Sequence, residues 1–277
     1  MDVLADNNQT WLLLKTTTNA IEGLTMENSL IRYLPQYNHN HLRSFNQILH
    51  WYPIQQPTVL LGAKDTRLTN FFEAYHFLLE QGYQVVIRPH GGTAIVCDEG
   101  VINVSWVRDL SQQTISIEQA YLDFIALVKH FLFPYNIALE SYKMPHSYCP
   151  GKFDLIVQQR KIGGTAQKRF KHGVTTSAYV SVHGNQTRRS ELLKEFYHIG
   201  QADDTYPQIH PQSMSQLQAF FENPIQVSDV YDRVEEILQS RSKVSSLDLS
   251  ENPLLSSIYT NQHSIFKQRQ RQLLDQL

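Results

Sequence analysis

Apolar positions recur with two different periods along this chain, and these periods predict where its strands and helices lie. Short apolar runs bounded by polar and turn-forming residues predict four strands in the first 90 residues, at 11–14, 45–51, 58–61 and 83–87. Apolar residues spaced three and four apart predict amphipathic helices at 21–34 and 70–81. Asn70 is a suitable N-cap for the second helix, and Gly82 would end it.

The middle of the chain continues with both patterns. Residues 88–106 alternate strand-forming runs with two glycine turns, which predicts a β-meander. Ser116 and Gln119 have the spacing of a capping box at the head of a long helix that ends before Pro134. The expected buried face of this helix consists of Ala120, Phe124, Leu127, Val128 and Phe131. Two strands, 153–157 and 173–182, and a short helix, 190–197, are expected to follow.

The last quarter of the chain has mainly helical patterns. Helices are expected at 211–222, 227–239 and 254–277, joined through a serine-rich linker at 240–250. The whole pattern predicts an α+β fold with a helical C-terminal part. We expect a catalytic core over residues 1–205, with a helical segment, 206–277, packed on or appended to the same domain.

Composition narrows the class of protein. The 277 residues include 42% hydrophobic ones, which is typical of a globular chain with a sizeable core. Lys and Arg number 24 against 26 Asp and Glu, so the net charge of −2 argues against general binding of nucleic acid. Residues 1–6 lack the cationic start of a signal peptide, and no run of 18 apolar residues occurs, so we expect a cytoplasmic protein without membrane spans.

Cysteine and histidine usage limits the chemistry. Two cysteines are too few for a disulfide framework in a chain of this length, so both are expected to be free thiols. The 12 histidines form no His-Glu-x-x-His motif, and no Cys-x-x-Cys motif occurs, so no metal is assigned. Cys97 lies in an apolar run and is expected to pack within a strand.

Residues 147–169 contain the densest concentration of reactive groups. Cys149 precedes Pro150, which disfavours the helical region, and Gly151 offers the permissive backbone of a turn. The thiol is therefore expected on a bend, although a free cysteine is more commonly a small buried apolar residue. Lys152 and Lys161 are near enough in sequence to favour the thiolate. Gly163 and Gly164 would leave room for a ligand beside the Lys161 amine, at the end of the same stretch.

One geometric condition follows from this stretch. In a straight hairpin about Gln158 and Gln159, Lys161 would face Val157, eight residues from Cys149 and roughly 26 Å away at about 3.3 Å per residue. The chain must therefore fold back near Pro150. We expect Cys149 on a loop that closes over a pocket, and not on the sheet.

Two segments resemble the signatures of the biotin/lipoate ligase and transferase superfamily. Arg88, Gly91 and Gly92 match its Arg-x-x-Gly-Gly motif, with Asn103 in the Asp-x-Gly-x-x-Asn-x-Ser segment that follows, and Lys161 begins its Lys-Ile-x-Gly-x-x-Gln motif. The resemblance extends over nearly the whole chain and implies a mixed, largely antiparallel sheet flanked by helices. The substrate-binding residues that it implies are Arg88, His90, Gly91, Gly92, Asn103, Gly163, Gly164 and Thr165.

A subgroup resemblance adds a function. Residues 147–151, Ser-Tyr-Cys-Pro-Gly, together with residues 61–67, are similar to octanoyl transferases that move an octanoyl group from the glycine cleavage H protein to E2 subunits of 2-oxoacid dehydrogenases. This resemblance implies that Cys149 carries the acyl group, that the H protein is the donor and an E2 lipoyl domain the acceptor, and that no cofactor takes part. A monomer is expected.

Three positions depart from the superfamily pattern. Thr93 replaces the third glycine of ATP-using lipoate ligases, which argues against adenylation because a side chain restricts that backbone. His90 replaces a small polar residue, and Cys97 replaces a histidine.

The residues support an amide-to-amide transfer. The Cys149 thiolate would attack the octanoyl amide carbonyl, and Lys161, as an ammonium group, would stabilise the thiolate and then protonate the leaving lysine. Backbone N–H groups of the turns at 91–92 or 163–164 are the expected oxyanion donors. The octanoyl slot has four candidate residues that could equally be ordinary core: Tyr83, Val85, Ile87 and Ile95.

Three other functions remain open on the sequence. An ATP-dependent lipoate ligase would share the Lys161 motif but would not need Cys149. A transferase that takes octanoate from acyl carrier protein would also use a cysteine. A non-catalytic protein that binds lipoyl domains would tolerate the loss of both residues. Incubation with each donor in the absence of ATP separates these functions.

Overall fold

The computed structural model describes residues 9–40 and 45–275. Residues 1–6, considered above for a signal peptide, and Leu277, the expected end of the last helix, lie outside this range. The α-helices are α1 (Ala20–Asn40), α2 (Phe71–Glu80), α3 (Ile117–Leu132), α4 (Gln186–Ile199), α5 (Val227–Arg241) and α6 (Pro253–Leu274). Within the described residues, no helix has the length and apolar character needed to cross a membrane.

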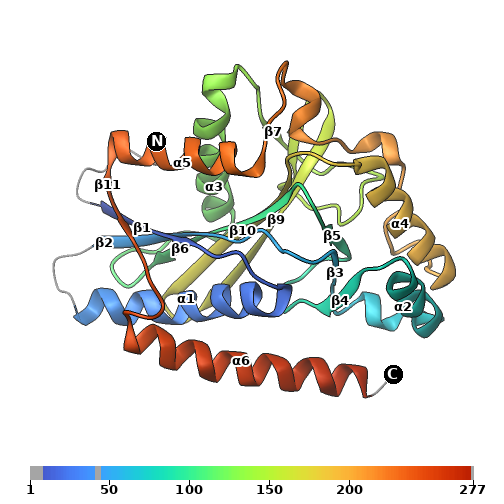
Figure 1. The fold of residues 1–277 in the computed structure, drawn as a ribbon, viewed down its shortest axis with the longest axis horizontal. Helices are drawn as coiled ribbons and strands as arrows, with labels where there is room; N and C mark the ends of the chain where they lie inside the picture. The colour runs from blue at the N-terminus through green and yellow to red at the C-terminus, as the bar shows by residue number, and fades with distance from the viewer. Residues whose placement is uncertain (1–8, 41–44, 276–277) are drawn as a thin grey trace.

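Strands in the described part of the chain form two sheets (Figure 1). The large sheet has eight strands in the order β11 (Lys243–Ser246), β1 (Gln9–Lys15), β2 (Phe45–Trp51), β6 (Val101–Asp109), β10 (Gly173–Ser181), β9 (Arg160–Phe170), β8 (Leu155–Val157) and β7 (Glu140–Ser141). The small sheet has the order β4 (Gln84–Ile87), β3 (Thr58–Leu61) and β5 (Ile95–Cys97). In the large sheet β1 pairs in parallel with β2 and β11, and all other pairs are antiparallel. The expected mixed, largely antiparallel α+β fold is confirmed.

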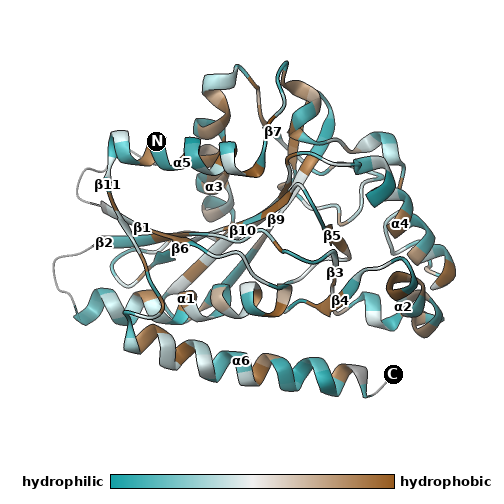
Figure 2. Cartoon of the chain, in the orientation of Figure 1, coloured by the Kyte–Doolittle hydropathy of each residue, from teal (hydrophilic) through white to brown (hydrophobic). Residues whose placement is uncertain are grey.

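Helices cover both faces of the large sheet. Figure 1 shows α1 and α6 below the sheet and α3 and α5 above it. Alternation along β1 explains this arrangement, because successive side chains of a strand point to opposite faces. Trp11 and Leu13 pack in the cluster that includes α3 and α5, whereas Leu12 and Leu14 pack with α1 and α6. The apolar colouring of the central strands in Figure 2 reflects this burial on both sides.

Residues 88–106 do not form the expected meander. β5 pairs with β3 in the small sheet, whereas β6 pairs with β2 and β10 in the large sheet. The turn at Gly100, with φ +85°, carries the chain from one sheet to the other. The sequence pattern of residues 88–106 correctly predicts two strands. It does not predict their partners, because strand pairing depends on long-range packing.

Two C-terminal segments also differ from expectation. Residues 211–222 contain only short 3₁₀ turns, at Pro211–Ser213 and Leu217–Phe220, because their backbone bonds elsewhere: Ser215 N–H donates to the Lys161 carbonyl at 2.8 Å. The serine-rich stretch contributes β11, which pairs with β1. Residues beyond 205 therefore complete the large sheet.

Helix boundaries follow local capping. Ser116 accepts a hydrogen bond from Gln119 N–H at 2.9 Å and caps α3, but the Gln119 side chain bonds to Asp123, so the reciprocal half of the box is not made. α4 begins at Gln186, earlier than expected, because Asn185 caps it by accepting from Arg188 N–H. α1 extends to Asn40 and includes Pro35.

Candidate active site

Cys149 lies on the loop between β7 and β8, off the sheet, as expected. The loop folds back so that the Lys161 ammonium donates to the Cys149 carbonyl at 2.7 Å and to the Tyr148 carbonyl at 2.9 Å. Along the strands, Lys161 pairs with Ile156 and not with Val157, because the two-residue turn at Gln158 and Gln159 pairs Val157 with Arg160. The predicted proximity of the thiol-bearing turn and the amine is confirmed.

The turn itself differs in detail from the prediction. Cys149 has φ 46°, in the left-handed region that side chains rarely occupy, while Gly151 has an ordinary φ. The Gly151 N–H donates to Asp154 at 3.1 Å. Local strain of this kind is common at functional residues and is held here by the bonds around the loop.

Lys161 is completely buried and forms an ion pair with Asp154 at 3.0 Å. Asp154 also accepts from the Met144 N–H at 3.1 Å, so one carboxylate joins the lysine to both ends of the loop. Burial raises the pKa of Asp154, and the neighbouring Lys161 ammonium opposes that rise. The hydrogens of Lys161 are directed at oxygen atoms of Asp154 and the loop, so the lysine clamps the loop that carries the thiol.

Arg88 is the cation in contact with the sulfur. Its Nη2 lies 3.1 Å from Cys149 Sγ and donates to the Thr93 carbonyl at 2.7 Å. Burial alone would lower the pKa of the Arg88 guanidinium, but the adjacent Cys149 and Asp65 raise it above its ordinary value. The family motif implies a substrate-binding role for Arg88, and its contact with the thiol is not visible in the sequence.

Gly92 makes the close approach of these two groups possible. It has φ +99°, and a Cβ at this position would lie 2.9 Å from Cys149 Sγ and 2.7 Å from Arg88 Nη2. Gly91 faces open space. Any side chain at Gly92 would therefore separate the guanidinium from the sulfur, which gives the Gly-Gly pair a steric role at the thiol.

Asp65 is a second carboxylate near Arg88 and comes from the segment 61–67. It accepts from the Gly62 N–H at 2.8 Å and from the Tyr197 hydroxyl at 3.0 Å. Burial raises the pKa of Asp65 to about 6, although these bonds and Arg88 act to lower it. Neither Asp65 nor Asp154 was singled out from the sequence; the signal for Asp154 was a charged residue inside an apolar run.

His90 points below the Gly-Gly turn into a buried polar cluster. Its Nε2 lies 3.1 Å from Glu27 of α1, which also accepts from the Tyr52 hydroxyl at 2.7 Å. Burial would raise the pKa of Glu27, but His90 and the hydrogen bonds outweigh it and lower the pKa to about 2. Burial lowers the pKa of the adjacent His50 to about 4. His90 thus anchors the turn from beneath.

Other predicted residues lie apart from the thiol. Lys152 is exposed and pairs with Glu118 at 2.9 Å, whereas the cation that contacts the sulfur is Arg88. Asn103 is buried near Tyr52 and Cys97. Thr165 donates to the Phe153 carbonyl at 2.8 Å. These residues support the framework around the site.

The second glycine pair accommodates protein and not a ligand. A Cβ at Gly163 would lie 2.3 Å from the Tyr179 carbonyl, and one at Gly164 would lie 2.8 Å from the Tyr179 ring. The expected space beside the amine is therefore filled by Tyr179. Cys97 is 1% exposed in β5, and burial raises its pKa to about 12, in agreement with its expected packing role.

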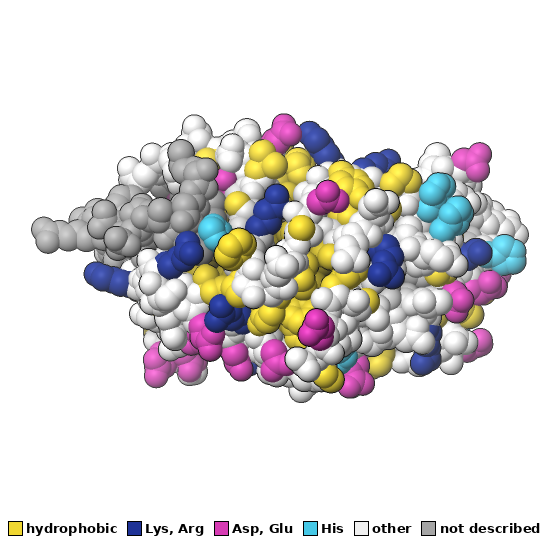
Figure 3. Space-filling view, turned by 90° about the horizontal axis from the view of Figure 1, so that it is seen from above, with side chains coloured by type: hydrophobic (Ala, Val, Ile, Leu, Met, Phe, Trp, Pro, Cys, Tyr) yellow, Lys and Arg dark blue, Asp and Glu magenta, His cyan; other side chains and the backbone are white. Residues whose placement is uncertain are grey.

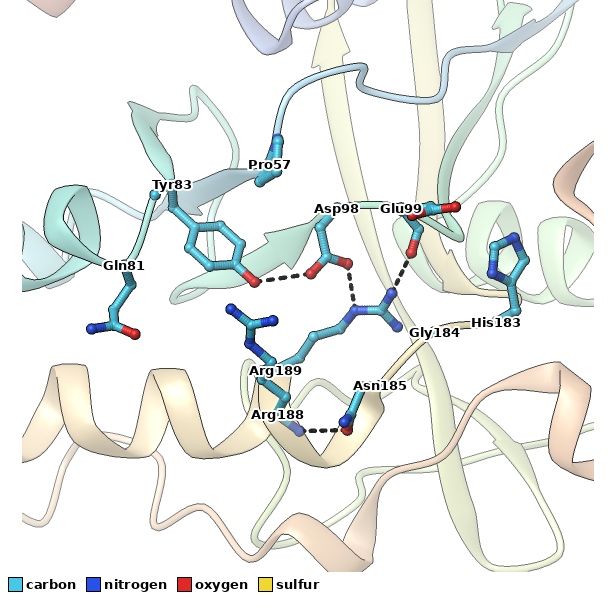
Figure 4. A pocket seen from close by; sticks show the side chains of 11 residues that line it. Pro57, Gln81, Tyr83, Asp98, Glu99, His183, Gly184, Asn185, Arg188 and Arg189 are labelled. Atoms are coloured by element: carbon cyan, nitrogen blue, oxygen red, sulfur yellow. Dashed lines mark hydrogen bonds and ion pairs between the residues drawn. The ribbon is translucent and has the colours of Figure 1, made fainter.

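The four candidate residues for the octanoyl slot belong to the core or its edge. Ile87 and Ile95 are buried, and Val85 packs against the same cluster. The Tyr83 hydroxyl donates to Asp98 at 3.0 Å and faces a separate cavity of about 430 Å³, where the Arg189 guanidinium bonds to Asp98 and to the Glu99 carbonyl (Figure 4). The alternative interpretation, ordinary core, therefore fits Ile87 and Ile95.

A larger cavity of about 860 Å³ lies between residues 135–140 and 220–229. Neither of these two cavities is lined by Cys149, Lys161 or Arg88. The face over α3 and α5 gathers apolar side chains near its centre, among charges of both signs (Figure 3). These features are separate from the thiol site.

Comparison with known proteins identifies the family. The profile of the lipoyl protein ligase A/B catalytic domain matches residues 23–239. This chain belongs to that family. The superfamily resemblance found in the sequence motifs is thereby confirmed.

Two curated relatives of this chain are acyltransferases by name. A lipoyl-[GcvH]:protein N-lipoyltransferase of Listeria monocytogenes is 36% identical over 185 residues, 65% of this chain and 66% of that protein. An octanoyl-[GcvH]:protein N-octanoyltransferase of Geobacillus kaustophilus is 35% identical over 191 residues, 68% of each chain. The solved structure of lipoate-protein ligase A bound with ATP superposes with a TM-score of 0.69 at 15% identity, covering 93% of this chain and 94% of that one. The last of these similarities concerns the fold alone.

Proposed function

We propose that this protein transfers octanoyl groups between lysine amides in protein lipoylation, through a thioester on Cys149. The observation that carries the proposal is the contact between Arg88 Nη2 and Cys149 Sγ, 3.1 Å apart at an open Gly-Gly turn. A cation at this distance favours the thiolate, which is the nucleophilic form of cysteine. An enzyme that adenylates its substrate has no use for such a thiol.

The first half of the reaction forms the thioester. The thiolate attacks the carbonyl carbon of the octanoyl amide, so that a C–S bond forms and, after the tetrahedral intermediate collapses, the C–N bond to the donor lysine breaks. The leaving amine must take a proton, which Lys161 supplies from its ammonium group. Asp154, 3.0 Å from Lys161, holds this ammonium group in an ion pair. Backbone N–H groups at the Gly91–Gly92 turn stabilise the oxyanion.

The second half regenerates the enzyme. The acceptor lysine attacks the thioester as a neutral amine and gives its proton to Lys161, while Cys149 leaves as a thiolate beside Arg88. One amide replaces another, and no cofactor is consumed. Arg88 therefore stabilises the sulfur anion at both ends of the cycle, and Lys161 exchanges the proton and holds the loop.

The partners follow from the named relatives and from the subgroup resemblance of residues 147–151. The relatives' names specify GcvH, the glycine cleavage H protein, as the acyl donor. The acceptor is an E2 lipoyl domain, as in the octanoyl-transferase subgroup. The enzyme acts as a cytoplasmic monomer.

Intact-mass spectrometry tests the thioester. Wild-type protein incubated with octanoyl-H protein should gain one octanoyl group, and Cys149→Ser, which folds but has a far less ionised hydroxyl, should gain none. Cys97→Ser is the matched control, because Cys97 is buried in β5. An adduct that persists in Cys149→Ser would assign the nucleophile to another residue.

Lipoyl transfer is a second candidate, because the Listeria relative at 36% identity is named a lipoyltransferase. The same assay with lipoyl-H protein distinguishes the two. A rate of adduct formation at least tenfold higher with the lipoyl donor would favour lipoyl over octanoyl transfer.

A further inference from the structure

The edge of the small sheet is closed by one side chain of the C-terminal helix. Gln270 of α6 accepts a hydrogen bond from the Ile87 N–H at 2.9 Å and donates one to the Ile87 carbonyl at 2.6 Å. β4 is an edge strand, paired on its other side with β3. An amide side chain has both a donor and an acceptor, so Gln270 satisfies both backbone groups of Ile87 as a neighbouring strand would.

This contact lies one residue from the cation at the thiol. Arg88 follows Ile87, and its N–H donates to the Leu61 carbonyl of β3 at 2.9 Å. The backbone at 87–88 is therefore held by β3 on one side and by Gln270 on the other. From this fixed point the Arg88 side chain reaches the Thr93 carbonyl and Cys149 Sγ.

α6 is itself fixed along its length. Leu255, Gln262, Phe266 and Gln270 are all buried, at spacings of seven, four and four residues, and therefore share one face. Gln262 accepts from Asn28 of α1 at 2.6 Å, and Phe266 packs in the cluster against which Cys149 also packs. Figure 1 shows α6 running beneath α1 toward β4. This helix begins after residue 239, where the family match ends.

We propose that Gln270 is a positioning residue: it holds the end of β4 so that the Arg88 guanidinium stays on the Cys149 sulfur. The C-terminal helix thus contributes to the reactivity of a thiol about 120 residues earlier in the chain. The proposal rests on the role of Cys149 in the proposed function. The test measures the reactivity of the Cys149 thiol and needs no acyl donor. A failure of the positioning role can therefore be distinguished from a failure of the proposed function.

The test measures alkylation of Cys149 by iodoacetamide as a function of pH, with peptide mass spectrometry to separate it from Cys97. Gln270→Met keeps the side-chain volume and removes both bonds to Ile87. We expect alkylation at pH 7 to slow by about threefold and the half-maximal rate to move to higher pH by roughly half a unit, because only the thiolate reacts. Gln270→Leu, which also removes both bonds and adds no charge, should give a similar change and serves if Gln270→Met does not fold.

Gln262→Met is the matched control. Gln262 and Gln270 are both 7% exposed on the same face of α6, but Gln262 bonds to α1 and not to β4. The charged groups around the thiol, Arg88, Asp65, Lys161 and Asp154, are unchanged in either variant. If the variants act only by loosening α6 from the core, alkylation should slow equally in Gln262→Met and Gln270→Met. That result would overturn the proposal.

A double-mutant cycle tests whether Gln270 acts through Arg88. Arg88→Gln should slow alkylation on its own, and adding Gln270→Met should then slow it no further. A full additional effect of Gln270→Met in the Arg88→Gln background, or no effect in the wild-type background, would exclude the positioning role.

Discussion

Two cations near Cys149 have different tasks at the scale of single residues. Arg88 contacts the sulfur directly, whereas Lys161 bonds to the carbonyls of the loop and to Asp154. A guanidinium stays charged at any working pH, while a lysine can give up a proton. In the proposed reaction, Arg88 therefore supplies a permanent charge for the thiolate, and Lys161 supplies a transferable proton for the leaving amine.

The Lys161–Asp154 pair is expected to be essential to stability. Lys161→Met should leave a buried carboxylate without its cation and lower the free energy of unfolding by about 3–5 kcal/mol at pH 7.5. The deficit should shrink at pH 5, because burial already raises the pKa of Asp154 and a protonated carboxyl needs no cation. Urea unfolding at both pH values measures this.

The double variant Lys161→Met, Asp154→Asn serves as control for that experiment. It removes both charges and should recover part of the lost stability with little dependence on pH. If Lys161→Met were as stable as wild type at pH 7.5, the ion pair would contribute nothing to the fold.

The lowered pKa of Glu27 predicts that the protein loses stability in acid. Its pKa is lowered from 4.5 to about 2 in the folded state, so the stabilisation is present above about pH 4.5 and is lost as the pH falls toward 2. The shift corresponds to about 3 kcal/mol. Glu27→Gln should therefore lose stability at pH 7 relative to wild type, and the difference should narrow steadily below pH 4.5. Denaturant midpoints of wild type and Glu27→Gln, measured across this pH range, check the prediction. If Glu27 had no such role, the two curves of midpoint against pH would be parallel.

At the scale of elements, the segment 206–277, expected to be helical and either packed on or appended to the core, contributes both a helix, α6, and a strand, β11, to the fold. β11 pairs with β1, and α6 lies against α1 with Leu255 fully buried. An amphipathic helix of this kind gains most of its stability from its packed face and little from its own propensity. The C-terminal segment thus supports both the large sheet and, through Gln270, the edge of the small one.

This packing predicts a contrast between two positions of α6. Leu255→Ala should lower the free energy of unfolding by about 2–5 kcal/mol, because the change leaves a cavity in the core. Ile265→Ala, at a residue 42% exposed on the same helix, should cost much less, within roughly 1 kcal/mol. Thermal or chemical unfolding of both variants checks the prediction. Equal losses would mean that α6 is not docked through the face of Leu255.

At the scale of the whole molecule, two sheets bring together groups from distant parts of the chain. Arg88 follows β4 of the small sheet, Lys161 lies on β9 of the large sheet, and Cys149 lies on the loop between β7 and β8. Thr93 and Gly92 lie on the connection between β4 and β5, where the ligases' third glycine is absent. The resulting centre places the Arg88 guanidinium against a thiol, which the proposed reaction uses in place of a route through adenylate.

The proposed reaction should therefore be independent of ATP and reversible. Octanoyl transfer from H protein to an E2 lipoyl domain should proceed in ATP-free buffer, and octanoyl-E2 should serve as donor in the reverse direction, because the two amides are chemically similar. Mass spectrometry of both carrier proteins at equilibrium measures the two directions. Strict dependence on ATP and free octanoate would restore the ligase alternative.

Local sequence determined much of this protein. The runs at 45–51 and 58–61 coincide with β2 and β3, and the Cys149-Pro150 turn lies off the sheet as expected, because strand propensity and turn chemistry act over a few neighbouring residues. Tertiary structure alone decided which strands pair, that β5 and β6 enter different sheets, and that Arg88, 61 residues from Cys149, is the cation on its sulfur. The Gln270 contact with Ile87, 183 residues apart, has the same origin. Such contacts depend on how separate apolar faces pack, and a local pattern does not specify which buried surfaces meet.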